Sequence, residues 1–237
     1  APFGDPYKYD LSSLAHFDGK NFKVNNKLIS TIGLRRYKAK SKGHYFSKKL
    51  VEMLGPRRAG NLMEDPYVHY AAAIQKLYED ISVGLITYYL KDVLEETGRL
   101  AVAGTGSMNI RLNRRLSSLP LVKEYTVHPA CSDAGTAIGA ASYSVRALGK
   151  KIEPVTNMYL GPSYDSDQCI EACLLHREKP EWEVLASPYE KAAELLANGQ
   201  LLAWFRGKME FGSRALGNRS ILANPNQIGI IDAINHQ

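Results

Sequence analysis

The chain has 237 residues and a formal net charge of +6, with 45% hydrophobic and 23% charged residues. This length allows one large domain or two modest ones, and the composition is ordinary for a soluble globular protein, which argues against a fibrous or disordered chain. The positive charge suits anionic ligands or nucleic acid, but net charge is an argument about partners rather than about fold.

Three cysteines, Cys131, Cys169 and Cys173, form neither an even framework nor a C-x-x-C pair. This usage favours a reduced, cytoplasmic setting over a secreted one. Cys169 and Cys173 lie four apart on a predicted helix, where we expect buried structural thiols rather than a zinc pair. The first residues lack the parts of a signal peptide, and no apolar run reaches the roughly eighteen residues that span a bilayer. We therefore expect a soluble protein without a membrane segment.

The first 63 residues are rich in turns and in basic side chains. The run from Arg35 to Lys42, followed by Lys48 and Lys49, could bind the phosphates of RNA. A solvated loop is the alternative, and it is favoured because no RNA-binding signature accompanies the run. Nucleic acid is therefore not an expected partner.

Residues 65–97 are compatible with one long helix. Asp65 is a candidate N-cap followed by a proline at the first helical position, and Gly98 is a stop signal. Gly84 is a candidate bend. Apolar side chains at helical spacing predict a core-facing stripe, formed by Ile74, Leu77, Tyr78, Ile81, Leu85, Tyr88 and Tyr89.

A short strand over 100–103 leads into a glycine turn and a helix that begins near Ile110. The turn reads Gly104-Thr105-Gly106-Ser107-Met108-Asn109. Free backbone N–H groups and the helix dipole make this arrangement suitable for an anion, although a plain tight connection gives the same pattern. The turn has neither G-x-G-x-x-G nor G-K-S/T, so it is not a Rossmann or P-loop element.

A second strand, over 125–127, precedes His128-Pro129-Ala130-Cys131-Ser132-Asp133 and a run of small residues to Ala141. Small side chains allow a helix to approach a neighbour or a ligand closely. Asp133 is an ordinary N-cap by local pattern, or else a ligand-binding carboxylate. The first alternative is the one that the residues alone favour.

Residues 150–162 are marked by proline and glycine and predict a linker. A helix is expected from Asp165 to about Arg177, a strand over 182–185, and a helix that begins at a capping box, Ser187 to Glu190, and ends at Asn198-Gly199. Alternating strands and helices predict an α/β or α+β fold.

The stretch from Ala203 to Pro225 contains the strongest chemical signal. An apolar run from Leu201 to Phe205 predicts a strand. Four cations follow around Glu210, namely Arg206, Lys208, Arg214 and Arg219, and three glycines lie among them, Gly207, Gly212 and Gly217. Arginines with tightly turning glycines suit a phosphate or a carboxylate. A solvated basic loop is the alternative, but the apolar residues between the charges favour a pocket.

The segment GKMEFGSRALGNRSILANP resembles the signature of the nodulation-type O-carbamoyltransferases, G-x-x-E-F/W-G-P-R-A-L-G-N-R-S-I-L-A, with Ser213 in place of proline. Further segments resemble the same family: APFGDPYKY, Gly55-Pro56-Arg57-Arg58, the A-x-x-x-Q-x-x-x-E spacing of Ala71, Gln75 and Glu79, the turn at 104–109 (family G-G-V-A-L-N), residues 129–141 (family P-A-x-x-D-A-G-x-A-x-G-A-A) and Tyr159-Leu160-Gly161-Pro162. Thr105 and Gly106 depart from the family's second glycine and valine.

The resemblance implies an α/β (α+β) chain with two parts. Residues 1–155 would be the C-terminal part of an actin-like ATPase-type domain, and residues 156–237 the first part of an incomplete YrdC-like α/β domain. It also implies a carbamoyltransferase in which carbamoyl phosphate and ATP form carbamoyl adenylate. The carbamoyl group would then pass to a hydroxyl of a small-molecule or sugar acceptor. A homodimer is compatible with this assignment.

The resemblance assigns roles to particular residues. Carbamoyl phosphate chemistry would use Arg206, Lys208, Arg214, Arg219 and Ser220. Nucleotide phosphates would be held by Gly104, Thr105, Gly106, Asn109 and Gly135. Asp133 would hold a divalent metal, either iron or a magnesium-like ion. Glu210 would orient a guanidinium or be structural, and both alternatives stay open.

The family completes its metal site with an H-x-x-x-H pair upstream of the APYG segment. None of the six histidines here forms that pair, and His128 is interpreted as a supporting or core residue. Because the family also continues well beyond the signature, we expect a partial chain that is inactive alone.

Two other classes of function remain open from the residues. One is an actin-like ATPase or kinase without carbamoyl chemistry, whose turnover would not depend on carbamoyl phosphate. The other is an RNA-binding module that uses the basic run at 35–49, whose affinity would fall steeply with salt.

Overall fold

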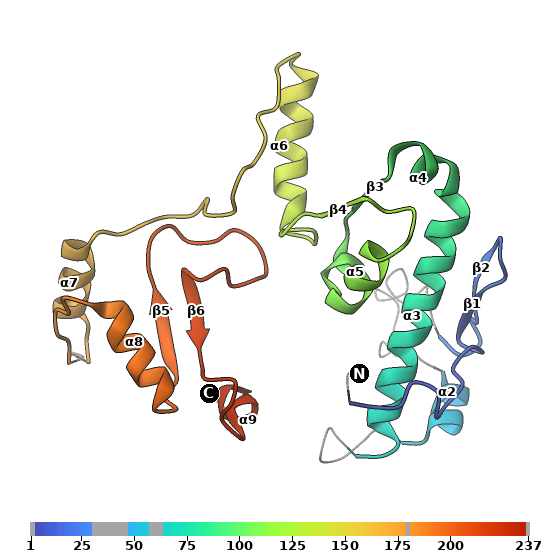
Figure 1. Ribbon diagram of the computed structural model, residues 1–237, viewed down its shortest axis with the longest axis horizontal. Coiled ribbons are helices and arrows are strands. Elements are labelled where there is room, and N and C mark those ends of the chain that lie inside the picture. Colours follow the sequence, from blue (N-terminus) through green and yellow to red (C-terminus); the bar gives the residue numbers. More distant parts are fainter. Residues whose placement is uncertain (1–2, 30–46, 57–63, 179–180, 236–237) are drawn as a thin grey trace, which may run out of the picture. The chain divides into compact units, whose positions relative to one another are not determined.

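The computed structural model of the chain describes residues 3–29, 47–56, 64–178 and 181–235. It combines helices with short strands in two compact units (Figure 1). The first unit contains residues 1–102 and 106–127, and the second contains residues 103–105 and 128–237. The mixture of helix and strand agrees with the predicted α/β class. The actin-like and YrdC-like assignments, and a domain boundary near residue 155, stay predictions.

The first unit is built along one long helix, α3 (Tyr67–Tyr89). An antiparallel hairpin of β1 (Ala15–Phe17) and β2 (Phe22–Val24) lies against it, as Figure 1 shows. A Cβ atom at Gly84 would lie 2.6 Å from the Phe17 ring. This glycine therefore permits close packing of the hairpin on α3. A shorter helix, α2 (Lys48–Leu54), is capped by the Ser47 side chain.

The single helix predicted over 65–97 is in fact two helices. The break falls at Leu90, and α4 (Lys91–Thr97) follows and ends at Gly98 in the left-handed conformation, as predicted. Asp65 does not cap α3. Its carboxylate instead accepts a hydrogen bond from Lys8 Nζ at 2.8 Å, because the N-terminal segment passes close to it, and Pro66 occupies the N-cap position.

Two apolar clusters form the core of the first unit, and α3 contributes to both. One combines Leu11, Leu14 and Leu28 with Ala73, and the other combines Leu94, Leu100, Leu112 and Leu116. Leu77 packs on the first cluster and Val83 on the second. The predicted stripe on α3 is only partly correct, since Ile74, Tyr78, Tyr88 and Tyr89 are exposed.

The second cluster lies beneath the parallel pair of β3 (Arg99–Val102) and β4 (Glu124–Val127). Both strands were predicted to within one residue. A 3-10 turn, η1 (Thr105–Met108), and helix α5 (Ile110–Ser117) connect them. Residues 103–105 belong to the second unit. The Asn109 side chain caps α5 by accepting the N–H of Leu112.

In the second unit, helix α6 (Gly135–Ala147) is followed by an irregular stretch that contains the predicted linker. Helix α7 (Ser166–Leu175) starts at a capping box formed by Asp165 and Gln168. Helix α8 (Pro188–Ala197) contacts β5 (Leu202–Phe205), which pairs antiparallel with β6 (Arg219–Leu222), and α9 (Ile230–Asn235) follows (Figure 1).

Two local predictions for the second unit are wrong. Residues 182–185 form no strand, because no partner strand pairs with them in the described part of the chain. The Ser187 side chain makes no capping hydrogen bond, although α8 does start at Pro188 as predicted. None of the helices in the described segments is both long enough and apolar enough to span a bilayer.

Candidate functional site

The loop between β5 and β6, together with the first two residues of β6, contains the predicted carbamoyl phosphate residues. In the antiparallel register Phe205 is opposite Arg219, so the loop of residues 206–218 closes on itself at these two positions. The Arg219 guanidinium carbon lies 3.5 Å from the centroid of the Phe205 ring. Its Nη1 donates to the Arg206 carbonyl at 2.7 Å, and its Nη2 donates to the Gly207 carbonyl at 3.2 Å. Arg219 therefore closes the base of the loop.

Glu210 organises the interior of this loop. Its Oε1 accepts backbone N–H groups from Leu216 at 3.0 Å, Asn218 at 2.7 Å and Arg219 at 3.0 Å. Partial burial of the carboxylate raises its pKa, but these backbone donors outweigh that effect and lower the pKa to about 2. Of the two alternatives for Glu210, its contacts support the structural one.

The remaining predicted residues differ in what they contact. Ser220 Oγ accepts the N–H of Gly217 at 3.1 Å, so this hydroxyl supports the turn. The Arg206 guanidinium lies 5.7 Å from the Tyr189 ring centroid. Arg206, Lys208 and Arg214 are exposed. Their role as phosphate ligands stays a prediction.

A second segment, residues 158–161, forms hydrogen bonds with the loop. Gly161 N–H donates to the Met209 carbonyl and Phe211 N–H to the Met158 carbonyl, at 2.9 and 2.7 Å. The Tyr159 hydroxyl donates to the Leu216 carbonyl at 2.9 Å. From its residues this stretch was predicted only as part of the linker at 150–162. Its supporting role was missed, and only the long-range contacts reveal it.

A cavity of about 450 Å³ lies at the start of α6. It is lined by Ala103, Gly104, Thr105, His128, Ala130, Cys131, Ser132, Asp133, Gly135, Thr136, Ile138 and Gly139. The structure thus brings together four of the residues predicted to bind nucleotide or metal: Gly104, Thr105, Asp133 and Gly135. The volume falls within the range of about 300–1,000 Å³ that small-molecule sites occupy.

Local contacts shape this cavity. Gly104, at a φ of +94°, donates its N–H to the Cys131 carbonyl at 2.7 Å, so that N–H is not available to a phosphate. Thr105 Oγ1 and Ser132 Oγ are 3.1 Å apart and share a hydrogen bond. A Cβ atom at Gly135 would clash with the Ala130 carbonyl, which explains why only glycine fits there.

Asp133 is not an N-cap, which corrects the local prediction. The N-cap position of α6 is Ala134, and no side chain caps this helix. Thr136 donates its N–H and its hydroxyl to the main-chain carbonyl of Asp133, at 3.1 and 2.6 Å. The Thr136 N–H in the first turn of α6 thus has a main-chain acceptor, and the Asp133 carboxylate is not used as a cap. Asp133 lies instead in the wall of the cavity.

The described residues contain no group of three or more His, Cys, Asp or Glu side chains that could hold a metal ion. Asp133 is a single carboxylate, so these residues do not by themselves fit a metal site. His128 accepts the N–H of Ala130 on Nδ1 at 3.1 Å, as expected of a supporting residue. Cys169 and Cys173 are half-exposed, so their predicted burial is wrong.

Two predicted nucleotide residues lie in the first unit. The Asn109 amide caps α5 and exchanges hydrogen bonds with the Gln75 amide, at 3.1 and 2.8 Å. Gly106 lies against the Tyr78 hydroxyl, where a Cβ atom would clash. The contacts of Asn109 give a structural reason for its residue type, and the nucleotide role of both positions stays a prediction. Of the basic run at 35–49, residues 35–46 lie outside the described residues, and Lys48 and Lys49 begin α2.

The loop and the cavity lie next to each other within the second unit. Gly212, at a φ of +118°, is so close to the cavity edge that a Cβ atom there would lie 3.4 Å from both the Ala130 Cβ and the Pro129 carbonyl. The sequence separates these two features by some 80 residues. The fold therefore joins a glycine-rich basic loop to an open cavity with an aspartate at its wall.

Comparison with known proteins identifies the family. Residues 5–142 match the family model of the carbamoyltransferase N-terminus, and residues 193–237 match that of the carbamoyltransferase C-terminus. The chain therefore belongs to the carbamoyltransferase family.

Individual relatives agree with this assignment. The chain is 33% identical to nodulation protein NolNO of Sinorhizobium fredii and 32% identical to nodulation protein NolO of Bradyrhizobium diazoefficiens, in each case over 99% of its length. It covers 33% and 40% of those two proteins. It is also 28% identical, over 60% of its length, to the 3'-hydroxymethylcephem-O-carbamoyltransferase of Streptomyces clavuligerus, of which it covers 28%.

Proposed function

We propose that this chain forms part of an O-carbamoyltransferase that uses carbamoyl phosphate and ATP. Water converts carbamoyl phosphate into carbamate and inorganic phosphate, and a carbamate oxygen then attacks the α-phosphorus of ATP with release of pyrophosphate. The carbamoyl group then passes from the resulting carbamoyl adenylate to the oxygen of an acceptor hydroxyl, which loses its proton, and AMP leaves. Family membership supports the class of reaction, and the name of the cephem relative supports a small-molecule hydroxyl as acceptor.

The observation that carries the proposal is the adjacency of the loop at 206–219 and the cavity at Asp133. Glu210 and Arg219 bind main-chain groups of the loop, and the side chains of Arg206, Lys208 and Arg214 are exposed. Cations on a preorganised loop can stabilise the charge that develops on phosphate oxygens as bonds to phosphorus or carbon change. The neighbouring cavity has the size for a nucleotide-type ligand.

Binding to the chain tests the loop first. We would titrate carbamoyl phosphate by calorimetry into the chain and into Arg206→Gln and Arg214→Gln variants. A hydrogen bond to a charged group contributes about 1.5–3 kcal/mol, so each variant should bind about 10-fold to 100-fold more weakly. Arg177→Gln, an exposed arginine of the second unit, is the matched control and should bind as the unaltered chain does.

Filling the cavity tests the nucleotide. Gly139 lines the cavity and has open space around its Cα, so Gly139→Trp places an indole there without a clash on the backbone. It should abolish ATP binding, whereas Ala137→Trp, on the same helix outside the lining, should not. ATP binding without carbamoyl phosphate binding would favour the ATPase alternative. Failure of both ligands to bind would contradict the proposal. A bound metal at Asp133 and a homodimer stay predictions.

A further inference from the structure

A second basic surface lies in the first unit, on the face of α5 that meets α3. Arg111, Arg114 and Arg115 occupy positions i, i+3 and i+4 and therefore share one face of the helix. A hollow of about 460 Å³ opens there, lined by Glu79, these three arginines and Ser118. Sequence reasoning did not single out this cluster, although the spacing of its arginines was visible.

Two carboxylates of α3 hold two of these arginines in place. Glu79 is only 12% exposed, and its oxygens lie 3.5 Å from Arg111 Nε and 3.5 Å from Arg115 Nη1. Asp80 lies 2.6 Å from Arg115 Nη2. Each guanidinium has further N–H donors beyond those that face the carboxylates. The carboxylates therefore orient the arginines while leaving donors for another acceptor.

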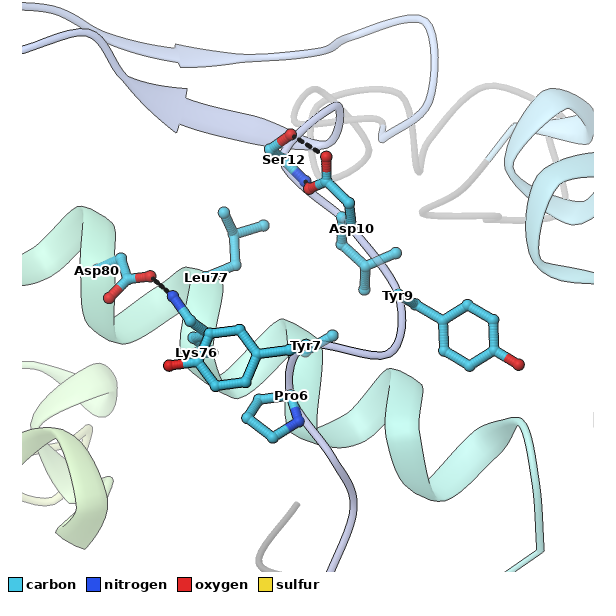
Figure 2. A pocket seen from close by; sticks show the side chains of 10 residues that line it. Pro6, Tyr7, Tyr9, Asp10, Ser12, Lys76, Leu77 and Asp80 are labelled. Atoms are coloured by element: carbon cyan, nitrogen blue, oxygen red, sulfur yellow. Dashed lines mark hydrogen bonds and ion pairs between the residues drawn. The ribbon is translucent and has the colours of Figure 1, made fainter.

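The same cluster extends toward the N-terminal segment. Asp80 also pairs with Lys76, and the Tyr7 ring lies beside that pair, with Lys76 Nζ 5.2 Å from the ring centroid (Figure 2). A second hollow of about 290 Å³ is lined there by Tyr7, Lys76, Glu79, Arg111 and Arg115 among others. Among the described residues, the carboxylates that form ion pairs with these cations are Glu79 and Asp80. The guanidinium of Arg114 has no ion pair with any described residue.

The helix dipole explains only part of this arrangement. Arg114 and Arg115 lie in the last turn of α5, where a cation interacts favourably with the dipole. Arg111 lies in the first turn, where the same charge is unfavourable. Glu79 offsets the charge of Arg111, whereas none of the ion pairs among the described residues involves Arg114. An anion that bridges Arg111 and Arg114 supplies the partner that Arg114 lacks there.

We propose that this face of α5 is a binding site for the phosphate group of a small phosphorylated molecule. Guanidinium groups give the planar, paired donors that phosphate oxygens accept, and two adjacent arginines can share one phosphate. The site uses no residue of the loop at 206–219, so it is separate from the carbamoyl phosphate site proposed above.

Nuclear magnetic resonance of the ¹⁵N-labelled chain tests this site directly. Inorganic phosphate and then pyrophosphate are titrated at constant ionic strength while the arginine Nε–Hε signals are followed. The signals of Arg111 and Arg114 should shift and saturate. Arg114→Gln should weaken this binding at least 10-fold, and Arg111→Gln should weaken it similarly.

Two controls separate this site from charge alone and from the loop. Arg99, which pairs with Glu124 at 2.8 Å on the same unit, gives Arg99→Gln the same change in net charge. In this variant and in Arg206→Gln, the phosphate affinity obtained from the Arg114 signal should stay within about 2-fold of that of the unaltered chain. Thermal unfolding followed by circular dichroism shows whether each variant is folded.

Three results would overturn the inference: no saturable shift at Arg111 and Arg114, equal weakening by Arg99→Gln, or binding in the Arg114→Gln variant that matches the unaltered chain. Binding of an acidic peptide or RNA on this face without binding of phosphate would also overturn it. Failure of carbamoyl phosphate binding at the loop would leave the result at α5 unaffected.

Discussion

The two units of this chain are stabilised in different ways. The first has two clusters of buried leucines, both of which pack on α3. In the described part of the second, the buried apolar residues are few and mostly small: Ala130, Cys131, Met158, Ala192 and Ile230. Its basic loop depends instead on a carboxylate and a guanidinium that bind main-chain groups. Apolar burial therefore shapes the first unit, and polar contacts to the backbone shape the loop of the second.

This difference has a functional consequence. Hydrogen bonds of Glu210 and Arg219 stabilise the loop without an apolar lining. Exposed cations on the loop are therefore compatible with its stability and can bind an anion. The predicted cations therefore differ in their surroundings. The Arg219 guanidinium donates hydrogen bonds to main-chain carbonyls of the loop, whereas the Lys208 side chain is exposed. The following predictions test this comparison, from the largest expected effect to the smallest.

The largest effect is expected in the leucine cluster of the first unit. Leu116 is 2% exposed, so Leu116→Ala should lower the free energy of unfolding by about 2–5 kcal/mol. Urea unfolding followed by circular dichroism measures this change. Val93→Ala, on a 52% exposed position of α4, should change it by less than about 0.5 kcal/mol. Equal effects of the two variants would mean that the cluster is not the main source of stability.

Regular patterns predicted the regular parts of this fold. The strands at 99–102, 124–127 and 202–205 and the ends of α4 and α8 were predicted because apolar runs and glycines act locally. The basic loop was predicted from its glycines and arginines. The inward use of Arg219 was not predictable, because it depends on the pairing of β5 with β6.

Three aspartates that precede helices show why local reasoning has limits. Asp165, which was predicted only as the start of a helix, caps α7. Asp65 does not cap α3, since Lys8, far away in the sequence, binds its carboxylate. Asp133 does not cap α6, since a turn of the main chain already supplies the acceptors. The same residue type therefore has three roles, and only the surrounding structure distinguishes them.

A smaller, local effect is expected when the Glu210 carboxylate is neutralised. Its pKa of about 2 lies below the ordinary value of 4.5, so its contribution to loop stability is complete above about pH 4.5 and is lost as the pH falls toward 2. The amide resonances of Leu216, Asn218 and Arg219 should move with a midpoint near pH 2. Glu210→Gln should remove this transition and speed hydrogen exchange at these amides.

The control for Glu210 is an exposed glutamate of the same unit. Glu183→Gln should leave the three amide resonances and their exchange unchanged. A midpoint near pH 4.5 in the unaltered chain would show that the backbone donors do not stabilise the carboxylate. The loop would then need another source of order, and the contrast between the two units would weaken.

The smallest effect is expected at Gly139 in the interior of α6, and Gly135, the first residue of the same helix, provides the contrast. A Cβ atom at Gly139 would meet no atom within 4 Å, so Gly139→Ala should raise the free energy of unfolding by about 0.5–1 kcal/mol through helix propensity. Gly135→Ala forces a Cβ atom against the Ala130 carbonyl, so it should destabilise the start of α6. Thermal unfolding compares the two variants. If Gly135→Ala were equally stabilising, the close approach of α6 to Ala130 would not exist in solution. The wall of the cavity at Asp133 would then differ from the one described above.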